Sequence, residues 1–319
     1  MIAYAIRRLL YVVIVVWIMS VLIFAITQAL PGNVAYAILG QFATDRQIAE
    51  LELLLGLKDP WYVQYWRWFS RLLHGDFGQS IIMQRPAGPL VLEAFGRSAI
   101  LAGIALTLVA ITGIWLGTHS ATHRGTLSDR VLTLAQYFFI AVPEFFWAIL
   151  AIILFSVWLG WLPATGYTPI GDSGFGRWLV HLILPVATLV TGLIAHVSRL
   201  TRSSMLETLR SPYVLMARAK GLPERLVLRR HALPNALLPT ITVLAVDVGI
   251  LIGGIVVVET VFAYPGLGRL LIFAIEHHDL PLLQAGMMVV TTVYALANLV
   301  ADLLYAWINP RIRYGGRVA

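Results

Sequence analysis

Six long apolar stretches alternate with polar segments along the chain. They lie near residues 9–30, 98–118, 132–160, 179–198, 236–258 and 284–308. Each is at or near the roughly 20 residues that an α-helix needs to cross the hydrocarbon core of a bilayer. The pattern therefore predicts an all-α polytopic membrane protein with six transmembrane helices. Pro143 leaves room for an interfacial turn within the third stretch.

The first stretch follows two arginines, as the apolar part of a secretory signal peptide also does. Its apolar core runs from Leu9 to Ala29, which is longer than the roughly 7–15 apolar residues of a signal peptide. No A-x-A cleavage site lies at the end of this core before Pro31. We therefore expect a retained transmembrane helix.

The long polar segment after the first stretch carries two amphipathic helix signals. Thr44 and Gln47 have the spacing of a capping box, and Gly56 and Pro60 end that predicted helix. The second signal spans Trp61 to Leu73 and is rich in Trp and Tyr, which favour a membrane interface. Two interpretations stay open for it: a helix lying on the outer leaflet, or a platform for an external partner.

A basic helix-turn-helix separates the fourth and fifth apolar stretches. Ser211 and Pro212 suit the start of a helix, and Gly221 can end it in the left-handed conformation. The Leu-Pro pair that follows turns the chain into a second short helix reaching His231. We interpret this compact helical pair, on the inner face of a membrane protein, as a docking element.

Composition and charge support the membrane assignment and orient the chain. Hydrophobic residues make up 59% of the 319 and charged residues 12%, with a mean hydropathy of +0.81. Lys and Arg concentrate in the segments that face the cytoplasm if both termini do, above all between 199 and 235. The positive-inside rule therefore predicts an N-in, C-in topology. That bias also accounts for the net charge of +7, so we expect no nucleic-acid binding.

Residues for catalysis or metal binding do not form a recognisable set. The only lysines, Lys58 and Lys220, follow Leu and Ala rather than the Gly of a P-loop. No His-Glu-x-x-His pattern occurs, and the absence of cysteine excludes disulfides and thiolate ligands. We interpret His277, His278 and Asp279 as a solvated loop rather than as metal ligands. The sequence therefore predicts no catalytic residue, no metal site and no enzyme activity in this chain.

Asp247 lies near the middle of the fifth stretch, where a carboxylate is costly. An intramembrane acid has to face protein or water, so Asp247 is a candidate residue of a translocation path. An interhelical hydrogen bond or ion pair is the equally weighted alternative. Gly249, Gly253 and Gly254 on the same predicted helix allow a neighbour to approach closely.

Short sequence blocks distributed along the chain together carry a family resemblance. They are GDFGQS (75–80), DR (129–130), GWLPATGY (160–167), SRLTRSSMLETL (198–209), ARAKG (217–221), HAL (231–233), NALLP (235–239), VVVETVFAYPGLG (256–268) and NPRIR (309–313). In this order they resemble permease subunits of binding-protein-dependent ABC importers, and more narrowly the dipeptide, oligopeptide and nickel branch. GDFGQS, with the Arg-Arg start, points to the first of the two permeases that pair in this branch.

The resemblance implies a type I ABC importer permease fold that works with other subunits. It divides the chain into a first helix with a long extracytoplasmic segment (1–97), a five-helix core with coupling helices at 211–233 (98–310), and a cytoplasmic tail (311–319). The implied partners are a second homologous permease forming a heterodimer, two ATP-binding subunits, an external solute-binding protein and membrane lipid. ATP and Mg would be bound by partner subunits, with no cofactor in this chain. The assembly would lie in the bacterial inner membrane.

The resemblance also implies roles for individual residues. The ATPase-coupling residues would be Tyr213, Met216, Ala217, Arg218, Ala219, Lys220, Gly221 and Leu222. Separately, the predicted topology places a second set outside the membrane, where aromatic residues and a Pro-Gly turn suit ordered contacts. These receptor-facing or outer-gate residues would be Trp66, Trp68, Glu259, Tyr264, Pro265 and Gly266. An apolar face through the first three coupling residues would enter a cleft on the ATPase.

Departures from the family pattern and a rival class leave some points open. The family usually has Asp before Tyr213 and Arg before Asn235, where this chain has Pro, so we expect docking with altered polar contacts. An ion-coupled secondary transporter is the alternative class, although no internal repeat of the kind it requires is apparent. Peptides are the first expectation for the cargo, with nickel, metal chelates, glutathione and sugars left open.

Overall fold

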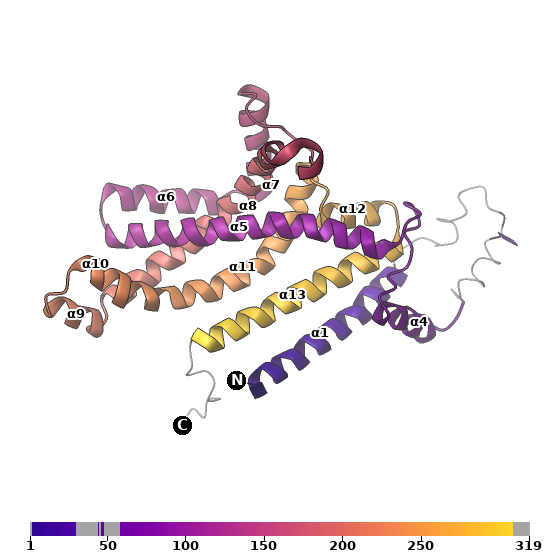
Figure 1. Ribbon diagram of the computed structural model, residues 1–319, viewed down its shortest axis with the longest axis horizontal. Helices are drawn as coiled ribbons and strands as arrows, with labels where there is room; N and C mark the ends of the chain where they lie inside the picture. The colour runs from indigo at the N-terminus through magenta and orange to yellow at the C-terminus, as the bar shows by residue number, and fades with distance from the viewer. Residues whose placement is uncertain (1, 30–43, 45, 48–57, 309–319) are drawn as a thin grey trace. The chain divides into compact units, whose positions relative to one another are not determined.

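The computed structural model describes residues 2–29, 44, 46, 47 and 58–308, and its regular structure is helical (Figure 1). In chain order the helices are α1 (Ile2–Ala29), α4 (Trp61–Leu73), α5 (Ala87–Thr122), α6 (Leu127–Ala141), α7 (Glu144–Ala151), η1 (Ile152–Trp158), α8 (Ile170–Leu209), α9 (Pro212–Ala219), α10 (Glu224–Leu226), η2 (Val227–Ala232), α11 (Leu233–Val261), α12 (Leu267–Glu276) and α13 (Leu280–Ile308). The two η elements are π-helical turns within longer helical segments. The predicted all-α class is confirmed.

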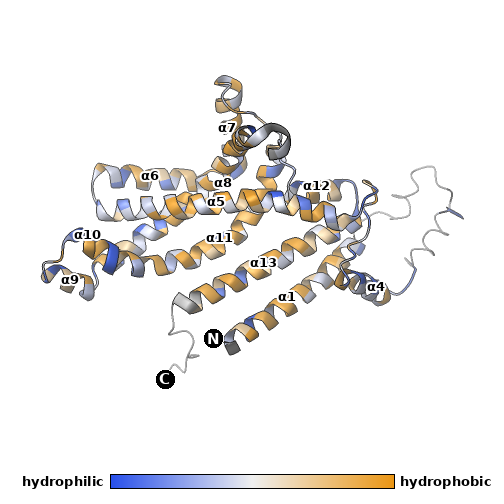
Figure 2. Cartoon of the chain, viewed as in Figure 1, coloured by the Kyte–Doolittle hydropathy of each residue, from blue (hydrophilic) through white to orange (hydrophobic). Residues whose placement is uncertain are grey.

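Five helices in the described part of the chain are long and apolar enough to cross a membrane, and a bent pair brings the candidate spans to six. The five are α1, α5, α8, the continuous segment Glu224–Val261, and α13, and Figure 2 shows the apolar residues along them. The bent pair is α6 with α7 and η1, at an angle of 102°. The turn expected near Pro143 is thus a sharp break, because this residue is extended (φ −61°, ψ 148°) and has no N–H to continue a helix.

The chain divides into two compact units. Among the described residues, the core unit comprises 2–5, 99–264 and 297–308, and the N-terminal unit comprises those of 6–98 and 265–296. α1, α5 and α13 contribute residues to both units. The functional division expected at residue 97 is a different partition and stays a prediction.

α8 is the central helix of the core unit, where it packs with α5, α7 and α11 around a common hydrophobic core. Gly113 and Gly117 of α5 approach it closely. A Cβ atom on Gly113 would lie 2.8 Å from Cγ1 of Val197, and one on Gly117 would lie 2.5 Å from the carbonyl oxygen of Ser198. The two glycines form a small-xxx-small pair, which lets membrane helices pack backbone against backbone.

α4 packs against the C-terminal half of α1 in the N-terminal unit. The Tyr65 and Ser20 hydroxyls share a 2.9 Å hydrogen bond, and the ring of Phe24 meets Tyr65 edge-on. The Gln28 amide donates a 2.9 Å hydrogen bond to Gln64. The bounds of α4 are those predicted from the sequence, because its aromatic repeat places one face on a neighbouring apolar helix.

The other helix predicted in this region lies mostly outside the described residues. Its capping box is present: the Thr44 N–H donates to Oε1 of Gln47 at 3.0 Å, and the Gln47 N–H donates to Oγ1 of Thr44 at 3.4 Å. The rest of that helix lies outside the described residues, as do the predicted tail 311–319 and the NPRIR block.

Asp279 organises the N-terminal unit at the start of α13. Its buried carboxylate accepts hydrogen bonds from the Ser80 hydroxyl, from the Ile82 N–H at 3.2 Å and from the Leu282 N–H at 3.3 Å. The expected solvated position is therefore wrong for Asp279, because backbone and hydroxyl donors replace water around it. The contacts also give the GDFGQS block a structural role, since its serine is one of the donors.

Candidate coupling surface and buried polar pairs

α9 begins and ends as the sequence predicts, with one difference at its start. Ser211 occupies the N-cap position in an extended conformation, and Pro212 follows at the first helical position. The Ser211 hydroxyl donates to the Thr208 carbonyl at 2.6 Å and makes no capping bond to α9. Gly221 has a φ of 75°, the left-handed conformation that other residues disfavour. The predicted glycine turn is confirmed.

α9 has one buried and one exposed face. A hydrophobic cluster of the core unit contains Ala121, Met205, Val214, Ala217, Val227, Ala232 and Ala236. Tyr213, Leu215 and Met216 are 46, 52 and 58% exposed. The expected docking face therefore changes: Ala217 lies one turn from Val214 on the buried side, and Leu215 joins the exposed apolar residues.

An exposed ion pair spans the glycine turn between α9 and α10. Arg218 donates from Nη2 to Oε1 of Glu224 at 2.6 Å and from Nε to Oε2 at 3.1 Å. Hydrogen bonding to Glu224 raises the pKa of the Arg218 guanidinium above its ordinary value. Solvent weakens such a pair, so it orders the turn more than it stabilises the fold. Ala219 and Lys220 are exposed, and Leu222 packs against the hydrophobic cluster.

The second helix of the pair continues into α11 without a break. α10, η2 and α11 form one helical segment from Glu224 to Val261. The predicted helix reaching His231 is confirmed, although it is the first part of a span and not a separate element. Figure 1 shows α9 and α10 together at one end of α8 and α11. The second helix of the pair is therefore continuous with α11.

A buried ion pair fixes the end of α8 that leads to α9. Asp129 accepts hydrogen bonds from Nε and Nη2 of Arg202 at 2.8 and 2.9 Å. It also accepts from the Ser120 hydroxyl and from the Gly125 N–H. The side chains of Asp129 and Arg202 are 6 and 24% exposed. Two parallel bonds to one carboxylate fix the geometry of this pair, which ties α5 and α6 to α8.

Two further polar contacts join α8 to α11. The Thr201 and Thr240 hydroxyls lie 3.2 Å apart, and the Ser204 hydroxyl donates to the Ala236 carbonyl at 2.8 Å. Such contacts satisfy polar groups where lipid offers no hydrogen-bond partner. These polar contacts therefore hold α8 to α11 at two successive positions along the helices.

Asp247 is fully buried and faces α8. Its Oδ1 lies 3.2 Å from Nδ1 of His196, whose side chain is 36% exposed. Its Oδ2 has no hydrogen-bond partner in the part of the chain that the structure describes. The interhelical pairing that the sequence left open is therefore confirmed for one oxygen. His196 was not singled out, and the signal that could have found it is a second ionisable residue within the preceding span.

Gly254 is covered by the first residue of α7. A Cβ atom at Gly254 would clash with the carboxylate of Glu144, so this glycine makes room for a side chain, and the close backbone approach expected there stays a prediction. At Gly253 a Cβ would meet nothing within 4 Å in the described part of this chain, so the expected close approach stays a prediction there.

The predicted receptor-facing or outer-gate residues differ in exposure. Trp66 is 63% exposed and Trp68 is half-buried. The remaining members are Glu259, Tyr264 and Gly266, which are buried, and Pro265, which is half-buried. Tyr264 joins the hydrophobic core of the core unit, so its aromatic ring is used for packing. Burial excludes the three buried residues from receptor contact in this structure and leaves them as candidates for the outer gate.

The fold is that of an ABC importer's membrane subunit. A chain of the MetNI methionine ABC transporter in an inward-facing conformation aligns with a TM-score of 0.55 at 15% sequence identity. The alignment covers 69% of this chain and 96% of that chain. The likeness shows an ABC importer permease-like fold and carries no information on cargo.

Sequence comparison identifies the family. Residues 110–314 match the family described as binding-protein-dependent transport system inner membrane component, and residues 1–91 match its N-terminal component. The dipeptide transport system permease protein DppB of Alkalihalophilus pseudofirmus is 37% identical, with 98% of this chain and 100% of the relative covered. The glutathione transport system permease protein GsiC of Escherichia coli (strain K12) is 39% identical with the same coverage. The chain belongs to this family of inner membrane permeases.

Family membership establishes the general role. The protein is a multi-pass permease subunit of an ABC transporter in the inner membrane, and it is not itself the ATPase. A binding-protein-dependent system of this kind works with an ATPase and a solute-binding protein. The resemblance inferred from the sequence blocks is confirmed.

Proposed function

We propose that this chain is the first of two homologous permeases that pair around a pathway for peptides or related small solutes. Two ATP-binding subunits would power transport, and an external binding protein would deliver the solute. Support comes from relatives named for dipeptide and glutathione transport, which match 98% of this chain. Glutathione is itself a small peptide, so both names point to peptide-like cargo.

Coupling to ATP hydrolysis is assigned to the exposed face of α9. Tyr213, Leu215 and Met216 present apolar surface on a helix whose opposite face is fixed in the hydrophobic cluster. A groove on an ATP-binding subunit would take this face as a helix-in-groove contact. This combination of an exposed apolar face and an anchored opposite face is the observation that carries the assignment.

Movement of α9 would reach the spans by two routes. The Asp129–Arg202 pair holds the end of α8, and α10 leads into α11 without a break. Closure of the ATP-binding subunits would therefore shift α8 and α11 together and change which side of the membrane the pathway faces. ATP binding drives such a change only if it favours one access state over the other.

Asp247 remains our candidate for the translocation path, now together with His196. The pair lies where α8 meets α11, and the imidazole is the partly exposed member. A shift between these helices would alter the exposure of the buried carboxylate. An uncovered carboxylate would favour a cationic group of the cargo by Coulomb attraction.

The test of the coupling assignment is ATP hydrolysis and uptake by the complete complex in proteoliposomes. Met216→Glu changes an exposed residue, so the protein should fold, but docking would bury an unpaired charge. We expect both rates to fall about tenfold or more, because such burial costs several kcal/mol.

The matched control is Leu127→Glu, which changes an apolar residue that is 77% exposed at the start of α6. Its rates should stay near those of the parent. Unchanged rates for Met216→Glu would contradict the coupling role of α9. Uptake driven by an ion gradient without ATP would favour a secondary transporter instead.

A further inference from the structure

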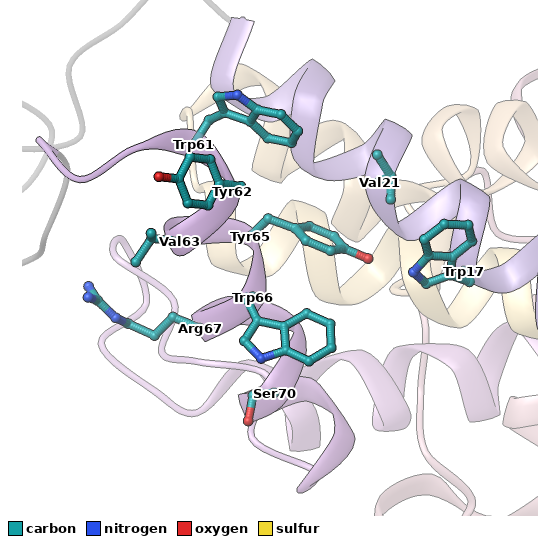
Figure 3. Close-up of a pocket in the computed structure, with 9 residues that line it drawn as sticks. All are labelled: Trp17, Val21, Trp61, Tyr62, Val63, Tyr65, Trp66, Arg67 and Ser70. Atoms are coloured by element: carbon teal, nitrogen blue, oxygen red, sulfur yellow. The ribbon is translucent and has the colours of Figure 1, made fainter.

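A groove of 840 Å³ lies between α1 and α4 in the N-terminal unit (Figure 3). Its lining is mostly aromatic and includes Trp17 and Val21 from α1, and Trp61, Tyr62, Tyr65 and Trp66 from α4. The volume lies within the range of small-molecule binding sites, which are likewise lined mainly by apolar and aromatic side chains.

The groove has a fixed floor and exposed walls. Tyr65 is 8% exposed, and its hydroxyl is bonded to the buried Ser20 hydroxyl, which donates in turn to the Trp17 carbonyl. Trp17, Trp61 and Trp66 are 51, 67 and 63% exposed. These large rings expose apolar surface to the surroundings, and covering that surface with an apolar partner is favourable in free energy.

The occupant has to be compatible with the membrane interior. Trp17 lies about 18 Å along α1 from Ala29 at a rise of about 1.5 Å per residue, roughly half the thickness of a hydrocarbon core. The neighbouring Ile14, Ile18 and Leu22 are exposed apolar residues that continue the lipid-facing surface of this span. A loop of another protein would have to bring unsatisfied backbone groups to this depth, whereas a hydrocarbon chain has none.

The opposite end of the groove is polar. Figure 3 shows Arg67 directed away from Trp17 and Val21. One of its nitrogens, Nη2, donates to Asp59 at 2.8 Å, and the same guanidinium has further N–H donors. Arg71 follows one turn later and is exposed. Guanidinium groups bind phosphate oxygens through paired hydrogen bonds, and phosphate is common to all phospholipids.

We propose that this groove binds one phospholipid, with an acyl chain against Trp17, Tyr65 and Trp66 and the phosphate beside Arg67. The binding site goes beyond the transport function and depends on neither the cargo nor the ATP-binding subunits. It also gives Trp66 a lipid partner in place of the receptor contact expected from the sequence.

Photo-crosslinking of the complete complex in vesicles tests the site. The probe is a phosphatidylcholine with a diazirine in one acyl chain, diluted into phosphatidylethanolamine and phosphatidylglycerol. Crosslinks mapped by mass spectrometry should be enriched several-fold at residues 17–21 and 61–70 over those at Trp115. This residue of α5 is 64% exposed and reports ordinary bilayer contact.

Val21→Trp fills the groove without adding charge and should lower crosslinking at residues 61–70 several-fold. Val13→Trp is the matched control, because Val13 is 58% exposed on α1 and does not line the groove. If Val21→Trp fails to fold, Trp17→Leu removes one wall and should give the same loss.

Three outcomes would overturn the lipid site. The first is crosslinking at the groove equal to that at Trp115. The second is an unchanged yield at residues 61–70 in a folded Val21→Trp or Trp17→Leu protein. The third is capture of the purified solute-binding protein, in place of lipid, by a photoreactive amino acid substituted at Trp66.

Discussion

α4 and α9 are both short helices that expose large apolar side chains, but they are anchored in different ways. α4 packs on the span α1 through a hydroxyl pair and aromatic rings. α9 rests on a cluster to which α5, α8, η2 and α11 all contribute. A helix resting on one span can follow the membrane surface, whereas a helix fixed to several spans can transmit force to them. The contacts on the buried face of a short helix therefore indicate whether its exposed face suits lipid contact or coupling to a partner subunit.

The largest expected effect comes from removing the ion pair that supports α9. Asp129→Ala leaves Arg202 partly buried without its carboxylate, which costs about 3 kcal/mol, at the low end for buried pairs because Arg202 keeps some exposure. We expect a lower midpoint of thermal unfolding in detergent and a loss of coupled ATP hydrolysis. Glu224→Ala, which breaks an exposed pair of the same unit, is the control and should change the midpoint little.

The next largest effect tests the packing of α5 against α8, the helix that the Asp129–Arg202 pair also holds. Gly117→Ala places a methyl group against the backbone of α8 and should destabilise the protein by about 1–3 kcal/mol. Gly103→Ala on the same helix meets nothing within 4 Å in the described part of the chain and should be neutral or slightly stabilising. The difference between their unfolding midpoints measures the close contact of α5 with α8. Identical midpoints would mean that this contact does not hold the two helices together.

A smaller loss of stability, with a large loss of transport, is expected at the glycine turn. Gly221→Val forces a β-branched residue into the left-handed conformation at a cost of about 1–2 kcal/mol. The turn would relax and move α9, so substrate-stimulated ATP hydrolysis should fall while membrane insertion is retained. Gly221→Asn is the control, because Asn tolerates this conformation. Normal stimulation in the Val variant would remove the turn from the coupling mechanism.

The smallest effect is expected at α4. Tyr65→Phe removes one hydrogen bond to Ser20, whose hydroxyl still donates to the Trp17 carbonyl at 2.7 Å. The cost should be about 1 kcal/mol in unfolding experiments, with unchanged ATP hydrolysis. Tyr62→Phe, at an exposed position of the same helix, is the control. A loss of ATP hydrolysis in Tyr65→Phe would show that α4 also takes part in coupling and would end the distinction between the two helices.

Features set by neighbouring residues could be predicted from the sequence. The aromatic repeat after Pro60 gave the bounds of α4, and the position of Gly221 gave the turn after α9. The capping box between Thr44 and Gln47 is likewise a short-range pattern. These features follow from backbone geometry and helical periodicity, which act over a few residues.

Features that depend on distant partners could not be predicted in the same way. Arg202 of α8 pairs with Asp129 of α6, and His196 of α8 pairs with Asp247 of α11. A single sequence does not show which helices become neighbours. Tyr264 illustrates the limit: an aromatic residue next to a Pro-Gly turn suits both an exposed contact and a core position. Its packing against residues of α8 and α11 decides for the core position.

Under the proposed coupling role, the unbroken segment Glu224–Val261 would also be a lever arm. At about 1.5 Å per residue the contour length of its 38 residues is about 57 Å, well beyond a hydrocarbon core of about 30 Å. If it tilts as one rod about the end joined to α9, a rotation of about 10° displaces the far end by about 10 Å. A small closing movement of the ATP-binding subunits would then become a displacement large enough to open or close the opposite side of the pathway.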